Sequence, residues 1–290
     1  MLTLADGALT ASVLDPASDT ERLGSRYCSG GYVWQVTDAC HGAAFAGPCF
    51  PAEPPPFDGQ GAPEVFEIAL GQHEAALGDE VYVIGVGRVR RESPVRPFHV
   101  RDNPTVTERA VWDVATPAPN SLRFRTHALF RDFALELVRT LELRGGSRTL
   151  ASTTLVMNLG TRALPLRWFA HPFFPWAGER VCRLSLEYAL PEAAALVTDA
   201  DGFVARRAGS DWSHGQYLLP RAALGGELAF EQCHPTLGCV RVRCGFPLGG
   251  LALWGNERTF SCEPFFQTIL EPGGEARFGL TYEFGTGGPA

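Results

Sequence analysis

Apolar and polar residues alternate with a period of two along most of the chain. The segment 240–246 (VRVRCGF) places apolar side chains between arginines, and the segment 277–284 (RFGLTYEF) places four apolar residues between polar neighbours. Such alternation is typical of antiparallel strands with one buried face. The same pattern, in whole or in part, predicts further strands at 8–14, 31–38, 80–87, 121–130, 133–143, 148–160, 164–170, 251–255 and 265–270.

Turn-forming residues separate these strands. The 32 glycines and 22 prolines fall largely between them, as turn residues do. Only the segment 191–201 (PEAAALVTDAD) has a helical character, and the Pro-rich segment 50–63 (FPAEPPPFDGQGAP) is too early and too short to link two separate cores. The sequence therefore predicts an all-β fold, a large antiparallel β-sandwich that residues 1–290 form as a single domain.

The charge pattern excludes several classes of partner and chemistry. The net charge is −7 and the basic residues are scattered, so the chain has no basic patch for nucleic acid or an anionic membrane. All 25 basic residues are arginine, which excludes lysine Schiff bases and a Walker lysine. The first residues lack the pattern of a secretory signal, and no segment approaches the roughly 18 apolar residues of a membrane span. We expect a cytoplasmic protein.

The eight cysteines form no CxxC pair. In a reducing compartment most cysteines are small buried hydrophobic residues, as the position of Cys244 in phase with apolar neighbours indicates. Cys233, His234 and Cys239 lie close together in the sequence, but their spacing fits no familiar zinc pattern. We expect eight thiols and no bound metal.

A histidine lies within the most aromatic segment of the chain, 168–176 (WFAHPFFPW). His171 is open to two interpretations. It is either a core histidine whose ring nitrogens bond to the backbone, or an acid or base held in a dry pocket. The choice depends on whether a second catalytic group accompanies it.

A carboxylate provides a candidate for that second group. Glu263 lies between Cys262 and Pro264 at the start of an apolar strand, where a carboxylate is paired, exposed or functional. The alternative is a strand-end carboxylate that faces solvent. Glu271 and Glu275 flank the turn that follows this strand, and we expect both to be solvated.

The order of these features resembles the aldose 1-epimerase, or galactose mutarotase-like, superfamily. The segment 122–174 is similar to the family's run of strands that leads to its active-site histidine. The segment 251–266 (LALWGNERTFSCEPFF) is similar to the approach to its catalytic glutamate, especially in the hexose-6-phosphate mutarotases. The resemblance covers residues 5–285 in strand order, and it implies a β-supersandwich.

The resemblance also implies roles for the two residues. His171 is the general acid on the ring oxygen, and Glu263 is the general base on the anomeric hydroxyl. Opening a pyranose requires both proton transfers, and ordinary pKa values of roughly 6.5 and 4.3 suit an imidazolium and a carboxylate near neutral pH. No metal or organic cofactor is needed. We expect the two groups to lie about 5–8 Å apart, with one sugar ring between them.

The first half of the chain departs from the family pattern. Hexose-phosphate mutarotases carry a His-Gly-x-x-Arg element, and the comparable segment 85–91 (GVGRVRR) has Gly87 in place of the histidine. Arg88 is a candidate contact for a ligand hydroxyl or carboxylate, or else a surface arginine. Glu64 and Glu67 lie in a Gly/Pro-rich loop that could close over a ligand.

Further candidate binding residues lie in the second half of the chain. Asp211 and His214 flank Trp212 in the segment 210–217 (SDWSHGQY), which offers polar groups for hydroxyls and an aromatic platform for a sugar face. The alternative is a polar turn with a packed tryptophan. Trp176 is a second aromatic candidate, close to the histidine in the sequence.

Our leading hypothesis is an aldose mutarotase-like enzyme that acts on a free or substituted hexose, a small-molecule sugar. The main alternative is a carbohydrate-binding or regulatory protein that kept the fold and lost turnover. A polysaccharide lyase or hydrolase on a similar sandwich would need a second acid near the glycosidic oxygen, and no paired carboxylate motif indicates one.

Overall fold

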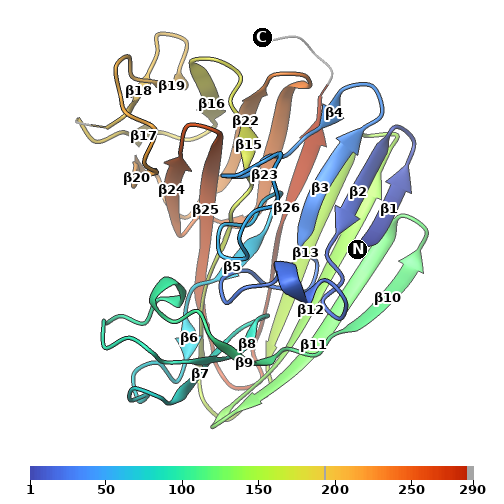
Figure 1. Cartoon of the computed structure of the whole chain (residues 1–290), viewed down its shortest axis with the longest axis vertical. Coiled ribbons are helices and arrows are strands. Elements are labelled where there is room, and N and C mark those ends of the chain that lie inside the picture. Colours follow the sequence, from blue (N-terminus) through green and yellow to red (C-terminus); the bar gives the residue numbers. More distant parts are fainter. Residues whose placement is uncertain (193, 286–290) are drawn as a thin grey trace.

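The computed structural model describes residues 1–192 and 194–285, which are built almost entirely of antiparallel strands (Figure 1). The helical elements in these residues are two single turns, η1 (Thr20–Arg22) and η2 (Val100–Asp102). No helix in the described ranges is long and apolar enough to cross a membrane. The antiparallel all-β fold predicted from the alternation is confirmed.

Two large sheets pack against each other. In spatial order, the larger sheet contains β10 (Asp113–Ala118), β11 (Ser121–Phe130), β12 (Phe133–Arg144), β13 (Thr149–Asn158), β26 (Glu275–Phe284), β23 (Gly238–Pro247), β22 (Glu227–His234), β16 (Arg180–Leu184), β19 (Phe203–Arg206) and β18 (Leu196–Thr198). The second sheet contains β20 (Gln216–Leu218), β24 (Gly250–Gly255), β25 (Thr259–Leu270), β14 (Leu164–Ala170) and β5 (Glu64–Phe66), and β15 (Phe174–Pro175) also pairs with β25.

Smaller sheets complete the fold. The N-terminal sheet, β1 (Leu2–Asp6), β2 (Leu9–Val13), β3 (Val33–Asp38) and β4 (Gly42–Ala43), lies over β12 and β13 of the larger sheet (Figure 1). Another sheet contains β6 (Ala69–Leu70), β7 (Glu80–Val83), β8 (Gly87–Arg90) and β9 (Val106–Arg109). A pair of short strands, β17 (Tyr188–Ala189) and β21 (Arg221–Ala222), forms a sheet of its own and packs against the main core.

Two local predictions were wrong. The segment 80–87 is not one strand, because Gly85 adopts a φ of +75° and the chain turns there from β7 into β8. The segment 191–201 contains β18 and no helix in its described residues, although its alanines favour one. Leu196 pairs with Arg206 of β19, and this strand pairing outweighs the local helix propensity.

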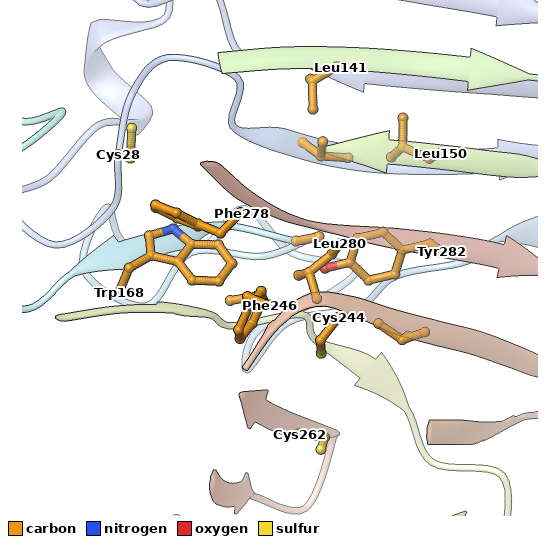
Figure 2. Packing of buried hydrophobic residues seen from close by; sticks show 14 of the residues in the cluster. Cys28, Leu141, Leu150, Trp168, Cys244, Phe246, Cys262, Phe278, Leu280 and Tyr282 are labelled. Carbon is orange, nitrogen blue, oxygen red and sulfur yellow. The ribbon is translucent and has the colours of Figure 1, made fainter. Parts of the chain in front are cut away.

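The main core fills the space between the two large sheets. Figure 2 shows Trp168 of β14 beside Phe278 of β26 and Phe246 of β23. The ring of Trp168 is 4.9 Å from that of Phe278 and 5.5 Å from that of Phe246. Full burial of one such apolar side chain contributes roughly 1.5–3 kcal/mol, so this layer holds the second sheet firmly in place.

A second apolar cluster covers the other face of the second sheet. Successive side chains of a strand point to opposite faces, so Phe169 points away from the face that carries Trp168. Phe169 packs at 4.7 Å against Phe265 of β25, and Tyr27 and Tyr32 cover them from the segment between β2 and β3. This covered face carries the two candidate catalytic residues.

Candidate functional site

His171 and Glu263 lie opposite each other on neighbouring chain segments. β14 pairs with β25 up to Phe169 opposite Phe265, and β15 pairs with β25 in the same register. His171 and Glu263 occupy matching positions between these two ladders. Their side chains therefore point to the same face of the sheet, although 91 residues separate them in the sequence.

The two side chains are in direct contact. The Nε2 atom of His171 is 3.2 Å from the Oε1 atom of Glu263. The predicted separation of 5–8 Å was wrong, because residues directly opposite in an antiparallel pair have Cβ atoms only about 4.5–5.5 Å apart. The sequence predicts a strand end for both residues, but only His171 follows the end of its strand, and Glu263 lies inside β25. The sequence also does not say that the two strands are neighbours.

The pair is sealed by aromatic rings. Only 1% of His171 and 3% of Glu263 is exposed. The imidazole lies 4.4 Å from the ring of Phe173, 5.6 Å from that of Trp254 and 6.2 Å from that of Tyr27. Phe169 and Phe173 of the segment 168–176, together with Trp254 and Tyr27, therefore surround the imidazole.

His171 is not a core histidine satisfied by the backbone. Its Nδ1 atom has no hydrogen-bond partner among the described residues, and its Nε2 atom faces Glu263 Oε1, which likewise has none, so the 3.2 Å contact between them lacks hydrogen-bond geometry. A buried polar atom left without a partner costs about 1–3 kcal/mol.

Burial changes the protonation of the pair. Burial, with the positive charge of Arg26, lowers the pKa of His171 well below its ordinary value. Burial raises the pKa of Glu263 to about 8, against the opposing effect of Arg26. The 3.2 Å distance would suit an ion pair, but both shifts favour a neutral imidazole beside a protonated carboxyl group at neutral pH. The expected starting forms, imidazolium and carboxylate, are therefore reversed in the closed site.

The raised pKa of Glu263 predicts a stability effect. The carboxyl group has a pKa near 4.5 in the unfolded chain and about 8 in the folded protein. The folded state binds more protons between these values, so the free energy of unfolding falls as the pH rises from about 4.5 to about 8. Glutamine does not ionise, so Glu263→Gln should not lose stability in this way as the pH rises. We expect the free energy of unfolding of the variant to exceed that of the parent at pH 9 by on the order of 4 kcal/mol.

Urea unfolding at pH 5 and pH 9 measures this difference. At pH 5 the two proteins should be similar, because the parent carboxyl group is then protonated in the folded state. Glu271→Gln, which changes an exposed carboxylate, is the matched control and should show no gain at pH 9. An equal difference between parent and variant at both pH values would contradict a buried, protonated Glu263.

Arg26 is a site residue that the sequence did not identify. Its guanidinium lies 4.9 Å from the ring of Tyr27 and 5.0 Å from that of Phe57. No carboxylate of the described residues lies within ion-pair distance of it, and its charge acts on both His171 and Glu263. The one signal in the sequence is the position of this arginine at the edge of the aromatic segment 26–36 (RYCSGGYVWQV).

Glu64 belongs to a buried structural network. Its Oε1 atom lies 2.5 Å from Arg139 Nη2 and accepts a hydrogen bond from Ser152 Oγ at 2.7 Å. Its Oε2 atom accepts a hydrogen bond from Trp168 Nε1 at 3.0 Å. With both oxygens bonded and 3% of the residue exposed, this carboxylate holds β5, β12, β13 and β14 together.

The structure does not bring Arg88 to the pair. Its guanidinium lies 3.2 Å from Glu80 and 2.9 Å from Glu108, both on strands next to β8. Glu67 is closer to the pair, since its charge contributes to the raised pKa of Glu263. It is exposed and forms an ion pair with Arg167 at 3.1 Å.

The segment 210–217 lies at the edge of the site. Asp211 accepts hydrogen bonds from the Ser213 amide and hydroxyl, and His214 is largely exposed. β20 then pairs Tyr217 with Trp254, whose ring lies beside that of His171. Burial and the charge of Glu263 raise the pKa of Tyr217 to about 12, although more than half of this residue is exposed.

Trp176 has a packing role in the structure. Its indole Nε1 donates a hydrogen bond to the Asn256 carbonyl group at 2.8 Å. Its ring packs at 5.1 Å, edge to face, against Trp212 and at 5.5 Å against Phe260. These contacts occupy both its polar group and its aromatic surface.

Two other features bear on where a ligand could bind: groups of possible metal ligands, and cavities. Among the residues that the structure describes, no group of three or more His, Cys, Asp or Glu side chains could hold a metal ion. A cavity of about 780 Å³ is lined by β16, β22, β23 and the end of β26, and its lining includes neither His171 nor Glu263.

Comparison with known proteins identifies the architecture. No protein-family model matches the chain, and no curated protein matches its sequence. The Slr1438 protein from Synechocystis sp. PCC 6803 superposes with a TM-score of 0.59 at 18% identity, covering 99% of this chain and 96% of that one. A galactose mutarotase related enzyme from Lactobacillus acidophilus gives a TM-score of 0.60 at 12% identity, with 98% and 96% covered.

The chain has the galactose mutarotase-like fold. A galactose mutarotase-like protein from Lactobacillus casei ATCC 334 agrees with it at a TM-score of 0.53 and 14% identity, covering 98% of this chain and 99% of that one. The predicted resemblance is thus confirmed at the level of the galactose mutarotase-like fold. At these identities the fold alone is shared, and function depends on the residues of the site.

Proposed function

We propose that the protein is an aldose mutarotase-like enzyme that interconverts the anomers of a hexose or hexose derivative. The observation that supports this most is the direct contact of His171 with Glu263 inside an aromatic enclosure, in a chain with the galactose mutarotase-like fold. An acid and a base are the two groups that ring opening requires.

The pair can supply both proton transfers without a change in its total charge. In the neutral form of the pair, Glu263 is protonated and the imidazole keeps a single N–H. Transfer of the carboxyl proton to the free ring nitrogen of His171 produces the carboxylate and imidazolium that the reaction needs. The carboxylate then takes the proton of the C1 hydroxyl while the imidazolium protonates the ring oxygen, and rotation and reclosure give the other anomer.

Substrate entry requires the cover over the pair to open. Tyr27 packs over His171, and its hydroxyl donates a hydrogen bond to the Asp58 carbonyl group at 3.1 Å. Phe57 in the same Pro-rich segment packs on Arg26. We infer that this segment moves away as the sugar enters. The bound sugar then separates the side chains of His171 and Glu263.

Several groups are available for the sugar hydroxyls. Arg26 packs on Tyr27, which covers His171, and Tyr217 pairs with Trp254. We add both to the predicted ligand contacts Asp211 and His214. Trp254 offers an aromatic face next to the imidazole. Polar groups around an aromatic surface are the usual composition of a sugar site.

Saturation-transfer NMR across a panel of aldoses and their phosphates tests the proposal. A substrate should show accelerated exchange of magnetisation between its α and β anomers when protein is added. Exchange at the uncatalysed rate for every sugar in the panel would overturn the enzymatic function.

A non-catalytic carbohydrate-binding protein is the second candidate. The observation that favours it is the closed pair, since a 3.2 Å contact leaves no room for a pyranose between the two groups. In the same experiment such a protein would transfer saturation to the bound sugar without accelerating anomer exchange.

The proposed mechanism predicts a pH profile. The pair holds the carboxyl proton only below the pKa of Glu263, about 8, so we expect anomer exchange to decline as the pH rises through this value. Arg26 lowers the pKa of Glu263, so Arg26→Met should shift this decline to higher pH. Arg88→Met, which changes an arginine away from the pair, is the control and should leave the profile unchanged. A profile that rises through pH 8 would contradict the assignment.

A further inference from the structure

Cys233 and Cys239 are paired across the hairpin of β22 and β23. The carbonyl oxygen of Cys239 accepts a hydrogen bond from the Gly285 amide, and the Cys239 amide bonds to Leu237 rather than to Cys233. In an antiparallel strand, the N–H and C=O groups of one residue point toward the same neighbouring strand. The N–H and C=O groups of Cys239 therefore do not point toward β22. The two cysteines therefore form a non-hydrogen-bonded cross-strand pair.

This type of pair has the spacing of a disulfide. Opposite residues at non-hydrogen-bonded positions have Cα atoms about 4.5 Å apart and side chains on the same face. Disulfides join Cα atoms about 4.4–6.8 Å apart, with Cβ atoms about 3.5–4.5 Å apart. Both cysteines are present as free thiols in the structure.

The two thiols also open onto the cavity of about 780 Å³. Both are half-buried, and Phe203 and Pro235 are among the other residues that line the cavity. Pockets of about 300–1,000 Å³ are the usual size for small-molecule ligands, so a small disulfide can reach the pair. Cys182 lies near Cys233 but is fully buried on the core face of the sheet, and it does not line this cavity.

We propose that Cys233 and Cys239 form a thiol-oxidation site, at which a low-molecular-weight disulfide such as oxidised glutathione enters the cavity and converts the pair reversibly into an intramolecular disulfide. This site is separate from the histidine–glutamate pair, and the proposal does not depend on the proposed function.

The reaction proceeds by two exchange steps. The thiolate of one cysteine attacks a sulfur of oxidised glutathione, forms a mixed disulfide and releases one glutathione thiolate. The thiolate of the other cysteine attacks the protein sulfur of that mixed disulfide and releases the second glutathione. Two cysteine thiols are oxidised, one glutathione disulfide is reduced to two thiols, and the two protons pass to the leaving groups.

The rate of this exchange should depend on pH. Burial, together with the neighbouring cysteine, raises the pKa of Cys233, and burial raises the pKa of Cys239. The thiolate is the reacting form, so exchange is slow at neutral pH and accelerates as the pH rises toward 9. The other charged groups that act on the two thiols are Arg180, Arg183, Glu231, Arg241 and Glu283.

Peptide mass spectrometry tests the proposal directly. The folded parent is incubated at pH 9 with oxidised glutathione, its remaining thiols are alkylated, and it is digested with trypsin. Both cysteines fall on the tryptic peptide 222–241. We expect this peptide to lose two hydrogens and to escape alkylation, whereas the exposed Cys40 takes up glutathione.

Single variants identify the mechanism. Cys233→Ser and Cys239→Ser should each retain a stable glutathione adduct on the remaining cysteine, while Cys40→Ser should leave the disulfide unaffected. A parent peptide that carries two glutathione adducts, or that stays reduced while Cys40 is modified, would overturn the proposal.

A second reagent tests the proximity of the thiols without any mutation. Phenylarsine oxide bridges two neighbouring thiols through one arsenic atom. One equivalent should protect both cysteines of the peptide 222–241 from alkylation in the folded parent. Alkylation of both cysteines in the presence of the reagent would show that the side chains do not face each other.

Discussion

Replacing Glu263 by glutamine is expected to slow anomer exchange at least about a hundredfold while sugar binding changes little. Glutamine keeps the size and polarity of the side chain but can neither give nor take the proton that the pair holds. His171→Asn should have a similar effect, because it removes the second member of the pair. Exchange spectroscopy on the best substrate of the sugar panel measures the rate.

The controls separate lost chemistry from lost structure. Glu271→Gln changes an exposed carboxylate at the end of the same strand and should exchange anomers like the parent. The double variant Glu263→Gln/His171→Asn should be little slower than either single variant, since the two residues act as a unit. Parental exchange rates in both single variants would contradict the proposed function.

Breaking the buried ion pair of Glu64 and Arg139 should have the largest effect on stability. Arg139 is 1% exposed and also donates a hydrogen bond to the Gly30 carbonyl group at 2.7 Å, so the pair joins β5, β12 and the segment before β3. Removing one partner leaves an uncompensated buried charge. We expect Glu64→Gln to lower the free energy of unfolding by about 3–5 kcal/mol.

Urea unfolding of matched variants tests the origin of this loss. The double replacement Glu64→Gln/Arg139→Met removes both charges and should be less destabilised than Glu64→Gln alone. Arg88→Met breaks an exposed ion pair with Glu80 and should change stability by about 0–1 kcal/mol. A loss of that small size in Glu64→Gln would contradict a structural role for the buried pair.

The candidate site could be predicted only in part. His171 and Glu263 stood out because a titratable group in an apolar segment is unusual in any fold. Arg26 and Tyr217 carried no comparable signal, because an arginine or tyrosine at the edge of a strand is common. Glu64 looked like a loop residue beside Gly and Pro, and only the arrival of Arg139 from β12 makes it a core residue.

The sequence by itself determined the antiparallel all-β architecture and the faces of the strands. Alternation with a period of two is a local property, and each strand can bury only one of its two faces. It therefore predicted the strands at 121–130 and 164–170 correctly. The helix expected at 191–201 rested on local helix propensity instead, and it was wrong because the pairing of β18 with β19 decided the outcome.

Only the tertiary structure decided which strands are neighbours. The register of β14 with β25 brings His171 to 3.2 Å from Glu263, and the resulting burial reverses the protonation that ordinary pKa values predict. Strand pairing depends on contacts between residues far apart in the chain, and a pKa depends on the solvent and charges around the group. Neither the strand pairing nor the pKa of a group can be read from the residues next to it in the sequence.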